Sequence, residues 1–196
     1  MGESRHERLF VSIALPETVK DSLWALQNEI RRLLAGDTVR WTRREQFHLT
    51  LRFLGDVELA RTEALQRALA GAGQACPPLR LRALGVGCFP DLRRPKVLWV
   101  GVTDGAGELA RLQAAVKLAS NAFTSEAPEA RFTGHVTLAR LRLLPRAEVD
   151  KLRQSVAGMR QQCLGEWTTG TMELMRSELV PQGARHSVVA SIALQG

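Results

Sequence analysis

The sequence predicts an α+β fold built from two similar halves. Apolar runs of strand length alternate with longer segments whose apolar residues recur at helical spacing. The four-residue motif His-x-Thr-Leu, called a His-x-Thr word below, occurs once in each half, at His48 and at His135. Arg8, which opens the first half, lies 40 residues before His48, and Lys96 lies 39 residues before His135. A shared order of elements at near-equal spacing indicates an internal repeat.

The first half reads as a strand at 8–15, ended by Pro16, and then a helix ended by Gly36. The apolar stripe of that helix is Val19, Leu23, Leu26, Ile30 and Leu33. The elements expected next are strands at 39–42 and 46–57, a helix at 58–73 and a strand at 79–89, where apolar residues alternate with arginines.

The second half repeats this order, with elements expected at 96–103 (strand), 105–123 (helix), 131–142 (strand), 146–162 (helix), 169–179 (strand) and 186–194 (strand). We expect residues 1–196 to form one bilobal domain. Its repeat spans roughly 8–90 and 96–180, and the strand at 186–194 completes the sheet. No Ser-, Gly- or Pro-rich linker separates the halves, so we expect two lobes that share one sheet system.

Composition favours a soluble cytoplasmic protein. The N-terminal MGESRHER lacks an apolar core, and no apolar run approaches the length of a membrane span. The three cysteines are widely spaced, which argues against a disulfide framework or a zinc site. We therefore expect free thiols, no membrane contact and a monomer.

The charge balance favours an anionic partner. The formal net charge is +7, and 23 of the 27 basic residues are arginines, whose guanidinium groups match phosphate oxygens well. Arginine bias can also follow genome base composition, and the basic residues are scattered. Charge alone therefore leaves nucleic-acid binding open.

The two His-x-Thr words each present an imidazole and a hydroxyl on one strand face. Residues i and i+2 of a strand point the same way, so His48 lies beside Thr50 and His135 beside Thr137. A lone strand histidine is usually structural. Two of four histidines sharing this word by chance is on the order of one in two thousand, so the pair points to a site.

Two opposed imidazoles suit displacement at phosphorus. One neutral histidine can take a proton from water while a protonated one gives a proton to the leaving oxygen, because the histidine pKa lies near neutrality. Thr50 and Thr137 can donate hydrogen bonds to the phosphate oxygens as charge develops there. This chemistry needs no metal or other cofactor, and no Asp, Glu and His cluster has ligand spacing.

The segments HLTLRFLG and HVTLAR resemble the paired motifs of the 2H phosphoesterase superfamily, in its LigT-like branch of RNA 2′,3′-cyclic phosphodiesterases. The resemblance extends to RLFVSIALP, VRWT, FPDLRRPKVLWVG and SELVPQGARHSVV. It implies a bilobal fold of antiparallel sheets flanked by helices, with one motif from each lobe facing a central cleft. It also implies hydrolysis of a terminal 2′,3′-cyclic phosphate of RNA to a 2′-phosphate, with His48 as proton donor and His135 as proton acceptor.

Other activities stay open beside this one. They are joining of RNA ends through a 2′–5′ bond, action on a small cyclic nucleotide or 2′–5′ oligomer, and nucleotide binding without catalysis on the same fold.

Two positions depart from the family pattern. Gly134 stands where proline is common, and we expect it to loosen the start of its strand. His186 stands where tyrosine is expected in the C-terminal hairpin, which puts any substrate contact of that tyrosine in doubt.

Five further residues are weaker candidates. Arg93 and Arg94 could steer RNA phosphates, although a solvated turn is favoured. Arg140 would point away from His135 in a regular strand unless a bulge turns it. Trp41 and Phe47 could stack a base.

Overall fold

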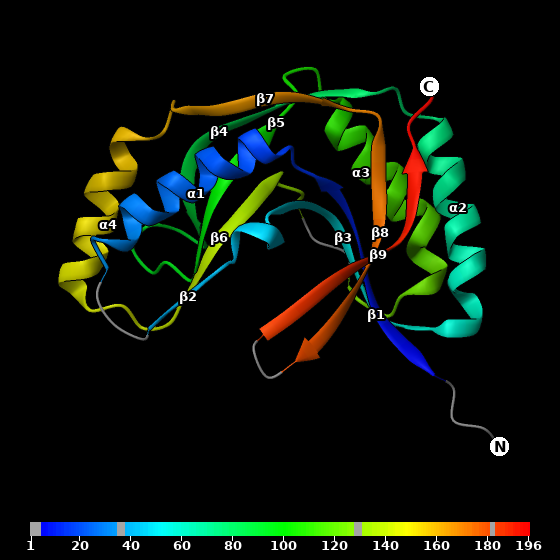
Figure 1. Ribbon diagram of the computed structural model, residues 1–196, viewed down its shortest axis with the longest axis horizontal. Helices are drawn as coiled ribbons and strands as arrows, with labels where there is room; N and C mark the ends of the chain where they lie inside the picture. Colours follow the sequence, from blue (N-terminus) through cyan, green and yellow to red (C-terminus); the bar gives the residue numbers. More distant parts are fainter. Residues whose placement is uncertain (1–4, 35–37, 128–130, 181–182) are drawn as a thin grey trace.

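The structure, a computed structural model, describes residues 5–34, 38–127, 131–180 and 183–196. Within these ranges the chain forms two antiparallel sheets flanked by helices (Figure 1). The first sheet has the strand order β3 (His48–Glu58), β1 (His6–Ala14), β8 (Thr171–Val180) and β9 (Gly183–Ala193). The second has the order β2 (Val39–Trp41), β6 (His135–Leu141), β5 (Val97–Thr103), β4 (Leu79–Phe89) and β7 (Cys163–Thr169). The predicted α+β class is confirmed, but the expected single sheet system is wrong, because the two sheets are separate.

Two helices each pack against the sheet that does not contain their preceding strand. α1 (Glu17–Arg31) follows β1 of the first sheet but packs against β7 of the second. α3 (Glu108–Ser120) follows β5 of the second sheet but packs against β3 of the first. α2 (Thr62–Gln74) contacts α3 and β9, and α4 (Arg146–Gly158) lies at the opposite end of the molecule (Figure 1). Each half of the chain thus supplies elements to both lobes, which ties the lobes together.

Among the described residues there are also three 3-10 turns: η1 (Arg44–Gln46), η2 (Leu59–Arg61) and η3 (Asn121–Phe123). η1 precedes β3 directly, so it fixes where the first His-x-Thr word begins.

The two strands that carry the His-x-Thr words have corresponding neighbours in the two sheets. β3 lies next to β1 in the first sheet, and β6 lies next to β5 in the second. The first seven residues of β3 and β6 have the same order of buried and partly exposed positions. On this basis we propose that residues 8–90 and 96–180 arose by duplication of one segment.

Most predicted elements are present, with differences at their ends. Four residues of the predicted helical stripe are buried in α1, but the helix ends at Arg31, so Leu33 lies beyond it. The expected stop at Gly36 lies outside the described residues. β7 was not predicted, because CLGEWTT mixes polar and apolar residues without strict alternation.

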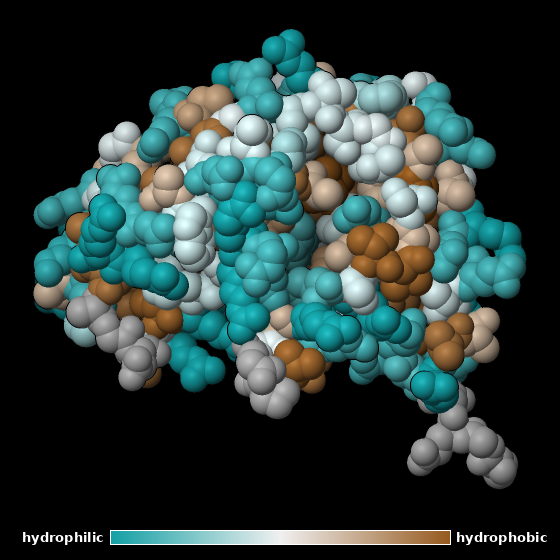
Figure 2. All heavy atoms as spheres, viewed as in Figure 1, coloured by the Kyte–Doolittle hydropathy of each residue, from teal (hydrophilic) through white to brown (hydrophobic). Residues whose placement is uncertain are grey.

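Hydrophilic residues cover most of the face shown in Figure 2. A hydrophobic patch lies over β8 and β9, the strands that carry the exposed side chains of Leu179 and Val188. No helix in the described ranges is long and apolar enough to cross a membrane.

A buried glutamine joins α1 to the second His-x-Thr word. Gln27 is fully buried, and its Nε2 donates to the carbonyl oxygens of Thr42 and Leu138, each at 2.8 Å. The backbone N–H of Thr42 also donates to Leu138 O, at 2.9 Å. Helix α1 therefore holds the strand that carries His135 and Thr137.

Replacing Gln27→Leu should destabilise the protein by about 1–3 kcal/mol, because the part-buried carbonyl of Thr42 loses a donor and the buried carbonyl of Leu138 keeps only the Thr42 N–H. Urea unfolding followed by circular dichroism would measure this loss. The control Glu29→Leu, at an exposed position of the same helix, should change the free energy of unfolding by less than about 0.5 kcal/mol. Equal effects of the two changes would contradict the proposed link.

Candidate active site

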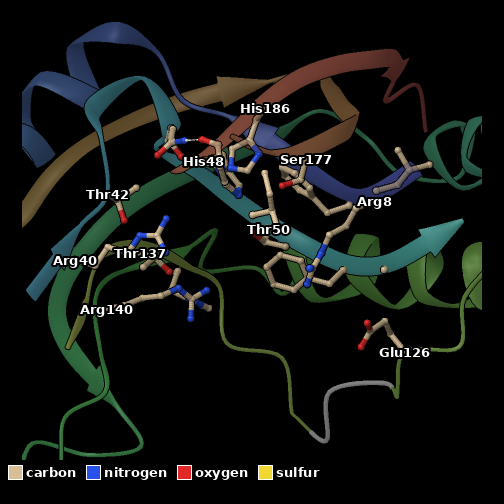
Figure 3. Close-up of a pocket in the computed structure, with 18 of the residues that line it drawn as sticks. Arg8, Arg40, Thr42, His48, Thr50, Glu126, Thr137, Arg140, Ser177 and His186 are labelled. Atoms are coloured by element: carbon tan, nitrogen blue, oxygen red, sulfur yellow. Dashed lines mark hydrogen bonds between the residues drawn. The ribbon is translucent and has the colours of Figure 1, made fainter. Parts of the chain in front are cut away.

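One pocket between the two sheets holds all four residues of the His-x-Thr words. It has a volume of about 510 Å³, and its walls include His48 and Thr50 of β3 and His135 and Thr137 of β6. Strands β1, β8 and β9 of the first sheet and β2 of the second supply further walls. The structure therefore brings the two words together, as their predicted faces require (Figure 3).

Both words contain a β-bulge at their leucine. On β3, Ser12 pairs with Thr50 and Val11 pairs with Arg52, so Leu51 is the extra residue. On β6, Trp99 pairs with Thr137 and Leu98 with Ala139, so Leu138 is the extra residue. Each leucine and the residue after it are buried, which reverses the alternation beyond that point.

The bulges turn a later residue of each strand into the pocket. Arg140 lies five residues beyond His135 and would face away in a regular strand, yet it lines the pocket. Phe53 holds the same position after His48, and it lines the pocket with half of its side chain exposed. The alternative that a bulge turns Arg140 is confirmed.

Backbone carbonyls fix both imidazoles in the same way. Nδ1 of His48 lies 2.7 Å from Gln46 O, and Nδ1 of His135 lies 2.7 Å from Thr133 O. A carbonyl can only accept, so each Nδ1 carries the proton. This leaves Nε2 of each ring to accept a proton or, when protonated, to donate one.

Aromatic rings enclose His48. Phe10 and His186 lie 5.0 and 5.6 Å from it between ring centroids, and His186 meets it edge-on. The pKa of His48 falls from 6.5 to about 4, chiefly because the ring is buried; the Gln46 carbonyl opposes this fall, and the nearby His186 and His135 add to it. His48 is therefore neutral at pH 7.

His186 is a third imidazole of the pocket. Its ring lies edge-on to Phe10, at 5.0 Å, and burial lowers its pKa. Its Nδ1 is buried and has no hydrogen-bond partner among the described residues. Gln46 links β9, the strand of His186, to His48. Its side-chain Nε2 donates to Ala184 O of β9, and its backbone carbonyl oxygen accepts from the His48 ring.

The weaker candidates differ in whether they line the pocket. Phe47 is 2% exposed and belongs to the core, so the expectation that it stacks a base is wrong. Trp41 lines the pocket, with the Arg31 guanidinium 5.1 Å from its ring centroid. Arg93 and Arg94 are exposed and do not line the pocket; their backbone N–H groups donate to Asp91 in a tight turn, at 2.7 and 3.1 Å.

Gly134 fixes the start of its strand, contrary to the expectation that it loosens it. Its carbonyl accepts the N–H of Val102 at 2.8 Å. A Cβ at this position would lie 2.5 Å from Val102 O, so the close approach of the two strands requires glycine.

The sequence analysis missed several polar residues of the pocket: Arg8, Arg40, Thr42, Gln46, Glu126 and Ser177. Arg8 directly precedes residues 9–13, all of which are buried, so no alternation marks the pocket face of β1. Ser177 and Glu126 likewise offered no readable pattern.

The cysteines are free thiols, as predicted, and Cys76 and Cys88 are buried. Burial raises the pKa of Cys88 to about 12, which keeps it protonated at neutral pH. Within the described ranges, no group of three or more His, Cys, Asp or Glu side chains is placed to hold a metal ion.

The low pKa of His48 should make the protein sensitive to acid. The unfolded chain binds a proton below pH 6.5 and the folded chain only below about 4, so stability present above pH 6.5 is lost as the pH falls through this window. Between pH 7.5 and pH 4.5 the His48 contribution to this loss should be about 2–3 kcal/mol. His48→Gln should remove that part, as measured by urea unfolding at both pH values. An identical pH dependence in the two proteins would contradict the burial of a neutral imidazole.

Comparison with known proteins places the chain among phosphoesterases. The LigT-like phosphoesterase family matches residues 13–99. An RNA 2′,3′-cyclic phosphodiesterase of Aeropyrum pernix is 39% identical over 144 residues, which cover 71% of this chain and 77% of the relative. One of Thermus thermophilus is 32% identical over 197 residues, covering 96% and 91%.

Solved structures share the fold. The protein TT0787 of Thermus thermophilus has a TM-score of 0.77 and 26% identity, covering 96% of this chain and 98% of its own. Escherichia coli LigT complexed with 3′-AMP has a TM-score of 0.74 and 22% identity, covering 98% and 100%. The bilobal fold with a central pocket is therefore the one that the resemblance implied. With two His-x-Thr words and relatives this similar over most of their length, the chain belongs to the LigT-like family of 2H phosphoesterases.

Proposed function

We propose that this protein is an RNA 2′,3′-cyclic phosphodiesterase, which opens a terminal cyclic phosphate to leave a 2′-phosphate. The observation that carries the proposal is the pair of His-x-Thr words on two different sheets that line one pocket. The relatives named above bear this activity in their names.

The fixed tautomers supply the proton transfers. His135 Nε2 takes a proton from water as the water oxygen attacks phosphorus. The bond from phosphorus to the 3′ oxygen breaks, and His48 Nε2–H gives its proton to that oxygen. The assignment of donor and acceptor follows the family resemblance, and the matching Nδ1 bonds of the two rings serve either direction.

His48 must gain a proton to act as the donor, because its lowered pKa leaves it neutral at pH 7. A bound phosphodiester carries a negative charge, and an opposite charge within a few ångströms favours the protonated imidazole. Substrate binding would thus bring about the protonation state that the reaction requires.

Thr50 and Thr137 flank the histidines on the same strand faces, where their hydroxyls can donate to the non-bridging oxygens of the phosphate. Arg40 and Arg140 lie on the same side of the pocket as Thr137 (Figure 3). Neither guanidinium has an ion pair within the described part of the chain, so both are available to an anion.

His48→Ala and His135→Ala should each lower kcat/KM on a 2′,3′-cyclic nucleotide by about 10²–10⁴-fold, the usual contribution of a positioned acid or base. Chromatography of the product should show the 2′-phosphate from the wild-type protein, with EDTA present throughout. A 3′-phosphate product, or variants as active as wild type, would refute the proposal. RNA halves with cyclic-phosphate and 5′-hydroxyl ends, assayed in parallel, would reveal end joining.

Thr50→Val and Thr137→Val should each lower kcat by about 10²–10³-fold, because valine keeps the shape but removes a donor to the developing charge. Thr→Ser at the same positions retains the hydroxyl and should keep most of the activity. Steady-state kinetics on the same substrate would measure both, and losses as large in the serine variants as in the valine variants would argue for packing instead.

A further inference from the structure

A second, smaller pocket adjoins the first. It has a volume of about 260 Å³ and is lined by residues at the start of β1 and by residues of β8, with Leu59 of η2. Arg8 and Ser177 line both pockets, so they stand at the junction between them. A linear ligand bound in the main pocket that extends toward the smaller pocket would pass Arg8 and Ser177.

Arg8 is free to bind an anion at this junction. It is exposed and has no ion pair or side-chain hydrogen bond in the ranges that the structure describes. Its neighbour Arg176 is occupied, because it pairs with Glu7 at 3.0 Å and with Glu178 at 3.8 Å. The unpaired charge at the junction is therefore that of Arg8.

Ser177 adds a hydroxyl beside this charge. It lies directly across from His186 in the β8–β9 pairing, and both side chains line the main pocket. Figure 3 shows Arg8, Ser177 and His186 along one wall of the pocket, while Arg40 and Arg140 lie beside Thr137 on the other. The Ser177 hydroxyl makes no hydrogen bond within the described residues, which leaves it available to a ligand.

The spacing from the His-x-Thr words fits an adjacent phosphate. Phe10, whose ring centroid is 5.0 Å from that of His48, is two residues from Arg8 on β1. Two strand residues span about 7 Å, and the long arginine side chain extends this reach. Phe10 and Phe53, with centroids 6.1 Å apart, lie on the same side of the first sheet as Arg8, as apolar walls of the pocket.

We propose that Arg8 and Ser177 bind the phosphodiester that joins the terminal nucleotide of the substrate to the nucleotide before it. The smaller pocket then receives that preceding nucleotide. The inference rests on the proposed function, and it makes an RNA end a better substrate than a cyclic mononucleotide, which has no second phosphate.

The test compares kcat/KM for the dinucleotide ApA ending in a 2′,3′-cyclic phosphate with kcat/KM for 2′,3′-cyclic AMP. We expect the wild-type protein to prefer the dinucleotide by at least 10-fold, as a charge-assisted contact allows. Arg8→Gln should reduce this preference about 10-fold, Arg8→Lys less, and Ser177→Ala by a few-fold. The dinucleotide with a neutral methylphosphonate linkage should lose the preference with the unaltered protein.

Arg146→Gln is the matched control, because it removes one exposed arginine from α4, outside both pockets. It should keep the wild-type preference. A preference that survives Arg8→Gln, that survives the neutral linkage, or that falls equally in Arg146→Gln would overturn the inference. If neither substrate is cleaved by the wild-type protein, the proposed function fails instead, so the two failures are distinguishable.

Discussion

The β-bulge at the leucine of each His-x-Thr-Leu word is the constraint on which the pocket depends. Before the bulge, strand alternation places the imidazole and the hydroxyl on the pocket face and apolar residues in the core. At the bulge, Leu51 or Leu138 and the next residue are both buried. The following side chain, Phe53 or Arg140, therefore returns to the pocket. A regular strand would turn Arg52 or Ala139 toward the pocket as its third side chain, whereas the bulged strand buries these residues and presents Phe53 or Arg140 instead.

Leu138, the bulge residue of β6, also takes part in the support around the site. The carbonyl oxygen of Leu138 accepts hydrogen bonds from Gln27 Nε2 and from the backbone N–H of Thr42. Helix α1 comes from the half of the chain that carries His48, yet it holds the strand that carries His135. Since α3 likewise crosses to β3, each histidine strand is supported by a helix from the other half. The position of one word relative to the other is thus set by packing that neither half could supply alone.

The features of this arrangement that depend on periodicity along the chain were predictable from the sequence. The strand faces of the words, the stripe of α1 and the order of elements follow from spacing along the chain. Positions that depend on tertiary contacts were not predictable from the sequence. Phe47 resembles an exposed aromatic residue before a motif, but it lies in the core because η1 turns the chain inward there. Arg8 and Ser177 come from strands distant in sequence, and only the pairing of β1 with β8 brings them together. Separate sheets could not be distinguished from a single one, because strand pairing partners leave no mark on local pattern.

The charges of the pocket agree with the proposed anionic substrate. Three arginines line the walls, and the structure gives none of them an ion pair within the described ranges, while burial beside two other imidazoles keeps His48 neutral. Such a pocket is short of negative charge, and the carboxylate of Glu126 is the only acidic side chain on its wall within those ranges. In the proposed function, an entering phosphodiester would supply negative charge, pair with the guanidinium groups and favour the imidazolium form of His48, the proposed donor. Positive groups gathered in a partly enclosed space without a counter-charge cost free energy and favour an anion, so the cost of assembling this pocket and its attraction for a phosphate have one physical cause.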